Sequence, residues 1–226
     1  VLTFLLAISV VFNKAEFRLA RISFARLTLF FAALTSFISL LLTYSRGSFI
    51  SLILGTSMFL LLSGRKKVVV LFLLSFVVGI LLLPKNLAGE GVKLFRTASI
   101  VARSESAKEA LLLFKENPLF GVGFNAYRYA RERHAIKTTN VFGSVHSASG
   151  TDNSFLFVLA TTGIVGFAAY IYLWFHVGKV FWKNPLILAT IVALFAHAFF
   201  TNSLFYPWVM QWLWILLGAA KAQKLL

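Results

Sequence analysis

The sequence predicts an all-α protein: a polytopic bundle of transmembrane helices with one large loop outside the membrane. Two observations support this prediction. First, 59% of the 226 residues are hydrophobic, and they form long apolar runs separated by short basic links, as helices that span a bilayer do. Second, the polar run at 84–153 holds six of the seven acidic residues. We therefore expect the chemistry of the protein to lie in that loop.

The formal net charge of +15 would suggest nucleic acid as the partner of a soluble chain. Here the Lys and Arg residues stand beside apolar runs, where positive charge marks the cytoplasmic side of a membrane. We therefore expect no nucleic-acid partner. The chain has no cysteine, which excludes disulfides and thiolate metal sites. It begins with Val1 inside an apolar run, and we expect it to be the C-terminal part of a longer protein.

Apolar runs and their links predict the elements in order. The first run is too short to span about 30 Å of hydrocarbon, and we interpret it as the end of a truncated helix. The runs before the loop are 1–12, 27–44, 48–62 and 68–83. Basic links before the second and fourth runs are expected in the cytoplasm. The break at 45–47 and the loop after 83 would then face outward.

Three further runs follow the loop, at 154–176, 186–200 and 208–220. Lys179, Lys183 and Lys221 mark the ends that we expect in the cytoplasm, including the C-terminus. The predicted domains are therefore transmembrane helices at 1–83, an extracytoplasmic loop at 84–153, and three C-terminal transmembrane helices at 154–226.

Within the loop, apolar residues recur at the spacing of one helical face. They are Ala107, Ala110, Leu111 and Phe114. Ser106 and Glu109 have the spacing of a capping box at a helix start, and Asn117-Pro118 ends the pattern. The sequence predicts an amphipathic helix of about three to four turns, lying on the membrane surface or packed over the helix ends.

Arg46 and Arg103 are the candidate anion-binding residues. Arg46 follows Ser45 at the outward break, where it is either a snorkelling anchor or one of two arginines that converge on an anionic group. Arg103 stands just before the predicted loop helix, with Arg96 upstream as a supporting residue. The planar guanidinium suits phosphate oxygens, and a lipid-carried diphosphate would place its charge at this depth.

Two further stretches of the loop have modest signals. The basic and aromatic run at 127–134, which includes Arg128, is either a solvated or headgroup-facing surface or a guide for an anionic glycan. The Gly-Val-Gly at 121–123 lacks the preceding strand and third glycine of a nucleotide fingerprint. We therefore interpret it as a tight turn.

His146, Asp152 and Asn153 close the loop just before a helix starts. Either Asp152 or Asn153 would serve as its N-cap. The Asp152 carboxylate would alternatively act as a general base on a sugar hydroxyl, and His146 offers the same chemistry near neutral pH. His197, which we place near the middle of a transmembrane run, is interpreted either as a hydrogen-bond donor between helices or, because ionisable residues are rare there, as a functional group.

Three segments in this order resemble the O-antigen ligase and polymerase superfamily. They are TYSRGSFISL at 43–52, RSESAKEALLLFKENPLFGVGF at 103–124 and TDNSFLFVLATTGIVG at 151–166. The resemblance implies a bacterial plasma-membrane glycosyltransferase, independent of metals and cofactors, whose loop faces the periplasm or cell exterior. It also implies that Arg46 and Arg103 bind the diphosphate of a polyprenyl-linked glycan donor. Ligases of this superfamily carry a histidine, often followed by Asn, where this chain has Asp152.

We therefore expect a polymerase or ligase of cell-surface polysaccharide, such as O-antigen or exopolysaccharide. Its partners would be the polyprenyl-diphosphate-linked donor, a glycan or lipid-anchored acceptor, and membrane lipids. Aspartate in place of histidine favours polymerisation or transfer of other glycans over ligation to lipid A core. The alternative is a lipid-linked glycan flippase or other polysaccharide transporter, which would need discontinuous helices and ionisable residues at the bilayer midplane.

Overall fold

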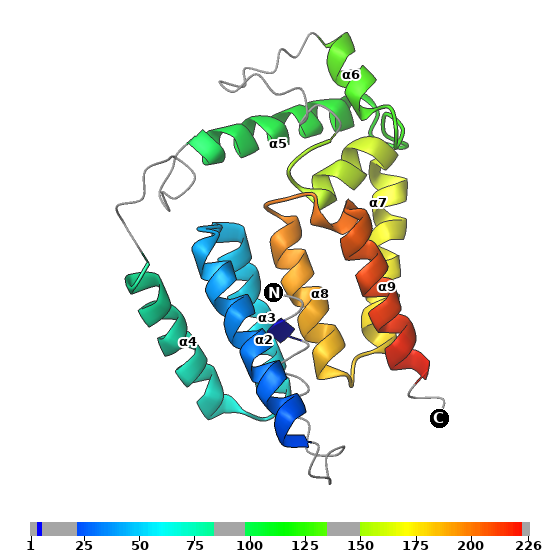
Figure 1. Ribbon diagram of the computed structural model, residues 1–226. Helices are drawn as coiled ribbons and strands as arrows, with labels where there is room; N and C mark the ends of the chain where they lie inside the picture. The colour runs from blue at the N-terminus through cyan, green and yellow to red at the C-terminus, as the bar shows by residue number, and fades with distance from the viewer. Residues whose placement is uncertain (1–3, 6–21, 84–97, 135–149, 223–226) are drawn as a thin grey trace. The chain divides into compact units, whose positions relative to one another are not determined.

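The computed structural model describes residues 4–5, 22–83, 98–134 and 150–222, and within these ranges the chain is helical and has no strand (Figure 1). The helices are α2 (Ile22–Leu42), α3 (Arg46–Leu62), α4 (Lys66–Leu81), α5 (Ala98–Glu116), α6 (Tyr127–Arg133), α7 (Ser154–Val180), α8 (Pro185–Ala198), the 3-10 helix η3 (Ser203–Phe205) and α9 (Pro207–Ala222). The prediction of an all-α fold is confirmed. The polytopic arrangement and the extracytoplasmic loop stay predictions.

The chain divides into two compact units. Unit 1 comprises Val1–Phe95 and Phe181–Ala196, and unit 2 comprises Arg96–Val180 and His197–Leu226. Unit 1 therefore contains α2, α3, α4 and most of α8. Unit 2 contains α5, α6, α7, η3 and α9, so the helices of the predicted outer loop pack in the same unit as α7.

Unit 1 is built on aromatic packing and on close approach of small residues. Phe49 of α3 packs edge-on against Phe76 of α4, with ring centroids 5.5 Å apart. On another face of α3, the Ser51 hydroxyl donates to the carbonyl oxygen of Ala193 in α8 at 2.6 Å. A Cβ added to Gly55 would lie 2.7 Å from the Cβ of Ala193. Small residues of this kind let helix backbones approach closely in lipid.

The outer surface of unit 1 is strongly apolar. On α4 and just after it, Leu71, Leu74, Leu81 and Leu82 are between 58% and 77% exposed. A soluble monomer rarely leaves such a surface to water, whereas hydrocarbon lipid solvates it. The exposed side chains of α4 therefore fit a membrane environment.

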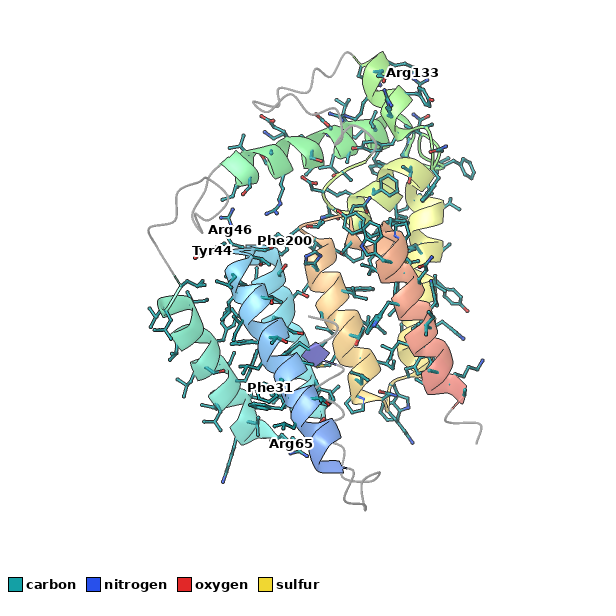
Figure 2. All side chains as sticks on the ribbon, viewed as in Figure 1. Phe31, Tyr44, Arg46, Arg65, Arg133 and Phe200 are labelled. Atoms are coloured by element: carbon teal, nitrogen blue, oxygen red, sulfur yellow. The ribbon has the colours of Figure 1, made fainter. Side chains whose placement is uncertain are left out.

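The two ends of α3 carry the turns that the sequence predicted. Tyr44 has φ 49, and the Ser45 side chain caps α3 by accepting from the Ser48 N–H. Arg46 is the first residue of α3, and Arg65 follows its other end. Figure 2 shows Tyr44 and Arg46 at one end of unit 1 and Arg65 at the opposite end.

Helix α7 organises unit 2, and it is broken. It is the one helix among the described residues that is long and apolar enough to cross a membrane, while Phe30–Leu42, Arg46–Leu62 and Pro185–Ala198 are shorter apolar helical segments. Gly163 interrupts α7 with φ 65 and ψ −167. This backbone conformation is accessible essentially only to glycine.

The segment from Pro118 to Gly123, which follows α5, fills the break in α7. Two of its carbonyl oxygens accept hydrogen bonds from α7, and two of its N–H groups donate to α7. The pairs are Ile164 N to Pro118 O at 2.9 Å, Val165 N to Leu119 O at 3.3 Å, Val122 N to Ala160 O at 3.0 Å, and Gly123 N to Thr161 O at 2.9 Å. Backbone groups freed by a broken helix at membrane depth need such partners. We call the region where these four bonds join residues 118–123 to residues 160–165 of α7 the α7 junction.

Helix α5 differs from the prediction at its start. It begins at Ala98, so Ser106 lies in mid-helix and the predicted capping box of Ser106 and Glu109 is wrong. The buried face also differs slightly, because Leu113 is fully buried whereas Leu111 is 41% exposed. Ser106 instead makes a contact with a distant loop.

Candidate functional site

Asn153 starts α7. Its side-chain oxygen Oδ1 accepts hydrogen bonds from the N–H groups of Phe155 at 2.9 Å and Leu156 at 3.0 Å. Its amide nitrogen donates to the carbonyl oxygen of Phe199, just after α8, at 3.3 Å. Of the two N-cap candidates, Asn153 is therefore the cap, which leaves the neighbouring Asp152 carboxylate for another role.

Ser106 ties α5 to the loop that precedes α7. Its hydroxyl donates to Thr151 Oγ1 at 3.0 Å and accepts from the Asp152 N–H at 3.3 Å. The Thr151 hydroxyl lies 3.4 Å from the Ser106 carbonyl oxygen, and Thr151 is only 3% exposed. These contacts fix the backbone of Asp152 against the middle of α5.

Arg103 and Asp152 are brought together by this arrangement. Arg103 lies three residues before Ser106, on the same face of α5. Partial burial raises the pKa of Asp152, and the positive charge of Arg103 acts in the opposite direction. Asp152 is exposed as a residue, but protein atoms surround its carboxyl group. The loss of hydration therefore affects the pKa of Asp152 more than the charge of Arg103 does. A carboxyl group whose pKa is raised by burial and acted on by a nearby positive charge marks a candidate functional site.

His197 also lies within electrostatic reach of Arg103. The sequence placed it near the middle of a transmembrane run, and that placement is wrong, because α8 ends at Ala198 and His197 is in its last turn. The charge of Arg103 acts electrostatically on His197 as well as on Asp152. The polar residues 201–203, which follow directly, were the signal in the sequence that the helix stops early.

A second cluster joins α6 to α5. Arg131 is 5% exposed, and its Nη2 lies 2.9 Å from Glu109 Oε2. Tyr127 is 1% exposed, and its hydroxyl has no hydrogen-bond partner within the described part of the chain. Burial, and next the negative charge of Glu109, raise the pKa of Tyr127 far above its ordinary value. Tyr127 therefore stays protonated at any physiological pH.

The 127–134 stretch is thus only partly the exposed surface that the sequence suggested. Arg128 is exposed and pairs with Glu132 at 3.1 Å, and Arg133 projects from the far end of α6 (Figure 2). Tyr127, Ala130 and Arg131 are buried. Their spacing of three and four residues was the available signal for a helix with one buried face.

The remaining predicted site residues are not brought into this cluster. Arg46 lies in unit 1, at the start of α3, so its convergence with Arg103 stays a prediction. Arg96 and His146 lie outside the described residues. In the ranges that the structure describes, no group of three His, Cys, Asp or Glu side chains could hold a metal ion.

Comparison with models of protein families assigns the chain to a family. The sequence model of the O-antigen ligase family matches residues 31–171. This range is more than half of the chain, and it contains Arg46, Arg103, Asp152 and the α7 junction. No curated protein and no solved structure gives a significant match. The chain therefore belongs to the O-antigen ligase family, whose members are integral to bacterial membranes.

Proposed function

We propose that this chain is the catalytic part of a bacterial membrane glycosyltransferase. The enzyme would transfer a glycan from a polyprenyl-diphosphate carrier to a hydroxyl of a glycan or lipid-anchored acceptor. Family membership supports a transferase of surface polysaccharide. The observation that carries the proposal is that the contacts of Ser106 hold Asp152 against α5 just before the start of α7. There the charge of Arg103 acts on the Asp152 carboxyl group.

Arg103 would bind the donor diphosphate, together with Arg46 from unit 1. A guanidinium donates charge-assisted hydrogen bonds to phosphate oxygens. As the bond from the anomeric carbon to the diphosphate oxygen breaks, its electron pair stays on the leaving group. Two arginines would stabilise that negative charge. In this proposal they take the role that a divalent cation has in other transferases, so the reaction would need no metal or cofactor.

Asp152 would act on the acceptor. Its carboxylate would accept the proton of the acceptor hydroxyl while the hydroxyl oxygen attacks the anomeric carbon. The raised pKa of Asp152 supports this role, because a carboxylate is a better base when its pKa moves toward neutral pH. His146 remains the alternative base, and His197 would contribute a polar contact from the end of α8.

The proposed orientation follows the positive-inside rule. Arg65 lies between α3 and α4, Lys66 and Lys67 begin α4, and Lys179 and Lys183 flank the end of α7. We propose that these links face the cytoplasm. The turn at Arg46, α5, α6 and Asp152 would then be extracytoplasmic, where lipid-linked glycans are polymerised or transferred, and the C-terminus would be cytoplasmic.

The test uses the full-length protein, reconstituted in lipid with a polyprenyl-diphosphate oligosaccharide. Release of polyprenyl diphosphate and the mass of the glycan product are followed together. Arg46→Ala and Arg103→Ala should each slow transfer about a hundredfold or more. Arg133→Ala is the matched control, because Arg133 is exposed at the end of α6. Wild-type rates in Arg103→Ala would refute its assignment to the diphosphate.

Asp152→Asn tests the base separately. Asn153 caps α7, so this substitution removes the proton acceptor and leaves the helix start intact. Transfer should fall at least as far as in Arg103→Ala, while insertion into the membrane should be unchanged. Full activity of Asp152→Asn would assign the base to His146 or to another group.

One observation favours the alternative, a lipid-linked glycan flippase or other transporter. Transporters often bind substrate where a transmembrane helix is discontinuous, and α7 is broken at Gly163. However, the backbone groups at this break are bonded to the segment from Pro118 to Gly123, which leaves them less available to a substrate. In the reconstituted assay, intact donor that moves between leaflets without release of polyprenyl diphosphate would identify a transporter.

A further inference from the structure

The segment that fills the α7 junction also presents a large apolar surface. Leu119 is 59% exposed and Phe120 is 73% exposed. On the other side of the junction, Ile164 and Val165 are 48% and 52% exposed. Because these α7 residues donate to the carbonyl oxygens of Pro118 and Leu119, the four apolar side chains belong to neighbouring stretches of backbone.

This surface is continuous with the outward face of α7. Further along the helix, Ile171, Tyr172 and Phe175 are also exposed. A helix of the length and composition of α7 in a membrane protein has lipid against such a face. The exposed side chains of the junction extend this face onto the chain that follows α5.

The length of α7 gives the depth of the junction. Residues 164–180 form the part of α7 after the break, and at about 1.5 Å per residue they span roughly 25 Å. That is slightly less than the roughly 30 Å of a hydrocarbon core. If Lys179 marks one edge of the core, Gly163 lies near the other edge.

We propose that the Leu119-Phe120 tip is a lipid-inserted anchor. It enters the acyl region of the bilayer at the edge of the hydrocarbon core, beside the break in α7. Two features of the tip fit this placement. The Leu119 carbonyl oxygen accepts a hydrogen bond from the Val165 N–H of α7, a partner of the kind that a backbone group in lipid requires. Glu116 and Asn117, which precede it, are exposed polar residues suited to the headgroup region.

The packing of Phe124 keeps the tip in position. Its ring lies 5.4 Å from that of Phe157 in α7 and 5.7 Å from that of Phe205 in η3, measured between centroids. The two ends of the segment are therefore fixed, one by α5 and one by this aromatic packing. The anchor sets the height of α5 above the bilayer, and it does so whether or not the protein transfers glycans.

The absence of cysteine from the chain allows a direct test with single-cysteine variants. Phe120→Cys in the full-length protein is labelled with a nitroxide and reconstituted in phosphatidylcholine and phosphatidylglycerol vesicles. Collision with oxygen, which concentrates in lipid, is compared with collision with a water-soluble nickel chelate. Tyr172→Cys is the lipid-facing reference on α7. Tyr129→Cys is the matched control on α6, where the side chain is 65% exposed.

The label at Phe120 should have an oxygen-to-nickel collision ratio close to that at Tyr172 and several-fold higher than that at Tyr129. A ratio no higher than at Tyr129 would overturn the proposal, because the tip would then lie in water. Low collision with both reagents would also overturn it, since the tip would be covered by protein. Leu119→Cys repeats the measurement if Phe120→Cys fails to insert.

Discussion

Replacing Gly163 with alanine should destabilise unit 2 by roughly 3 kcal/mol or more. With φ 65 and ψ −167, residue 163 has a backbone conformation that costs a non-glycine residue about 1–3 kcal/mol. An added Cβ would also lie 2.3 Å from the carbonyl carbon of Leu119 and 2.5 Å from the backbone nitrogen of Phe120. These atoms are backbone and cannot rotate away. Relief therefore requires the segment to move.

The hydrogen bonds of the α7 junction set the second part of this cost. Each of the four bonds contributes about 0.5–1.5 kcal/mol net, so their loss would cost roughly 2–6 kcal/mol. If the segment moves enough to break all four, the bonds and the strain together give about 3–9 kcal/mol. A smaller movement would break fewer bonds but leave more of the strain.

The assay is unfolding of the purified protein in mixed micelles by titration with dodecyl sulfate, followed by tryptophan fluorescence. Gly178→Ala is the matched control on the same helix, because a Cβ there meets nothing within 4 Å. That variant should be neutral or more stable by up to about 1 kcal/mol, the helix-propensity gain. If Gly163→Ala unfolds at the same dodecyl sulfate fraction as Gly178→Ala, the reasoning about the junction is wrong.

Gly121→Ala extends the same test to the segment from Pro118 to Gly123, which pairs with α7 at the junction. At Gly121, φ is 67, and a Cβ would lie 2.4 Å from the backbone carbon of Thr161. The double variant with Gly163→Ala should cost clearly less than the sum of the two single variants, because either substitution alone disrupts the shared hydrogen bonds. Strict additivity would show that the two glycines act independently.

Three further predictions concern the clusters beside α5. Arg131→Met should lower the free energy of unfolding by about 3 kcal/mol, because it leaves Glu109 without its partner in a largely buried site. Arg128→Met, at the exposed pair, should lower it by less than about 1 kcal/mol. Thermal denaturation compares the two variants. In the wild-type protein, the free energy of unfolding should fall as pH rises above the ordinary pKa range of aspartate, because a raised pKa means that the folded chain retains this proton longer than the unfolded chain. Asp152→Asn should remove this fall. Asn153→Ala should cost about 1 kcal/mol in the same denaturation assay through loss of the α7 cap.

Each of these has a contradicting outcome. Equal losses in the two arginine variants would show that burial adds nothing to the Arg131 pair. Superimposable stability profiles for wild type and Asp152→Asn between pH 4 and pH 7 would mean that folding does not perturb the carboxyl group. An Asn153→Ala variant as stable as wild type would indicate that another group takes over the cap.

Most helix positions follow from local properties of the sequence, and so they could be predicted. The run at 48–62 corresponds to α3, Arg46–Leu62, and the run at 154–176 to α7, Ser154–Val180. Apolar runs define such helices, and residues such as Ser45 and Asn153 define their starts. Asn153 was correctly one of two candidates for the cap, because the N-cap preference of Asn and Asp is local.

The errors arose where a contact spans many residues of sequence. Ser106 has the spacing of a helix cap, but its partners are Thr151 and Asp152, about 45 positions away. The burial of Arg131 depends on Glu109 of another helix. At Gly163, the Thr-Thr-Gly-Ile-Val run at 161–165 contains β-branched residues around a glycine, a sign of weakened helix. Nothing local indicates which segment pairs with it.

The hydroxyl of Ser154 has a consequence for the order in which the protein is made. It accepts a hydrogen bond from the Leu204 N–H at 3.2 Å and lies 3.4 Å from the Thr201 carbonyl oxygen. These partners emerge from the ribosome about 50 residues after Ser154 itself. During synthesis, the loop that carries Asp152 is therefore unsupported on one side until α8 and η3 have been translated. A nascent chain that stops before η3 would carry Arg103 and Asp152 without the framework that holds Asp152 in position.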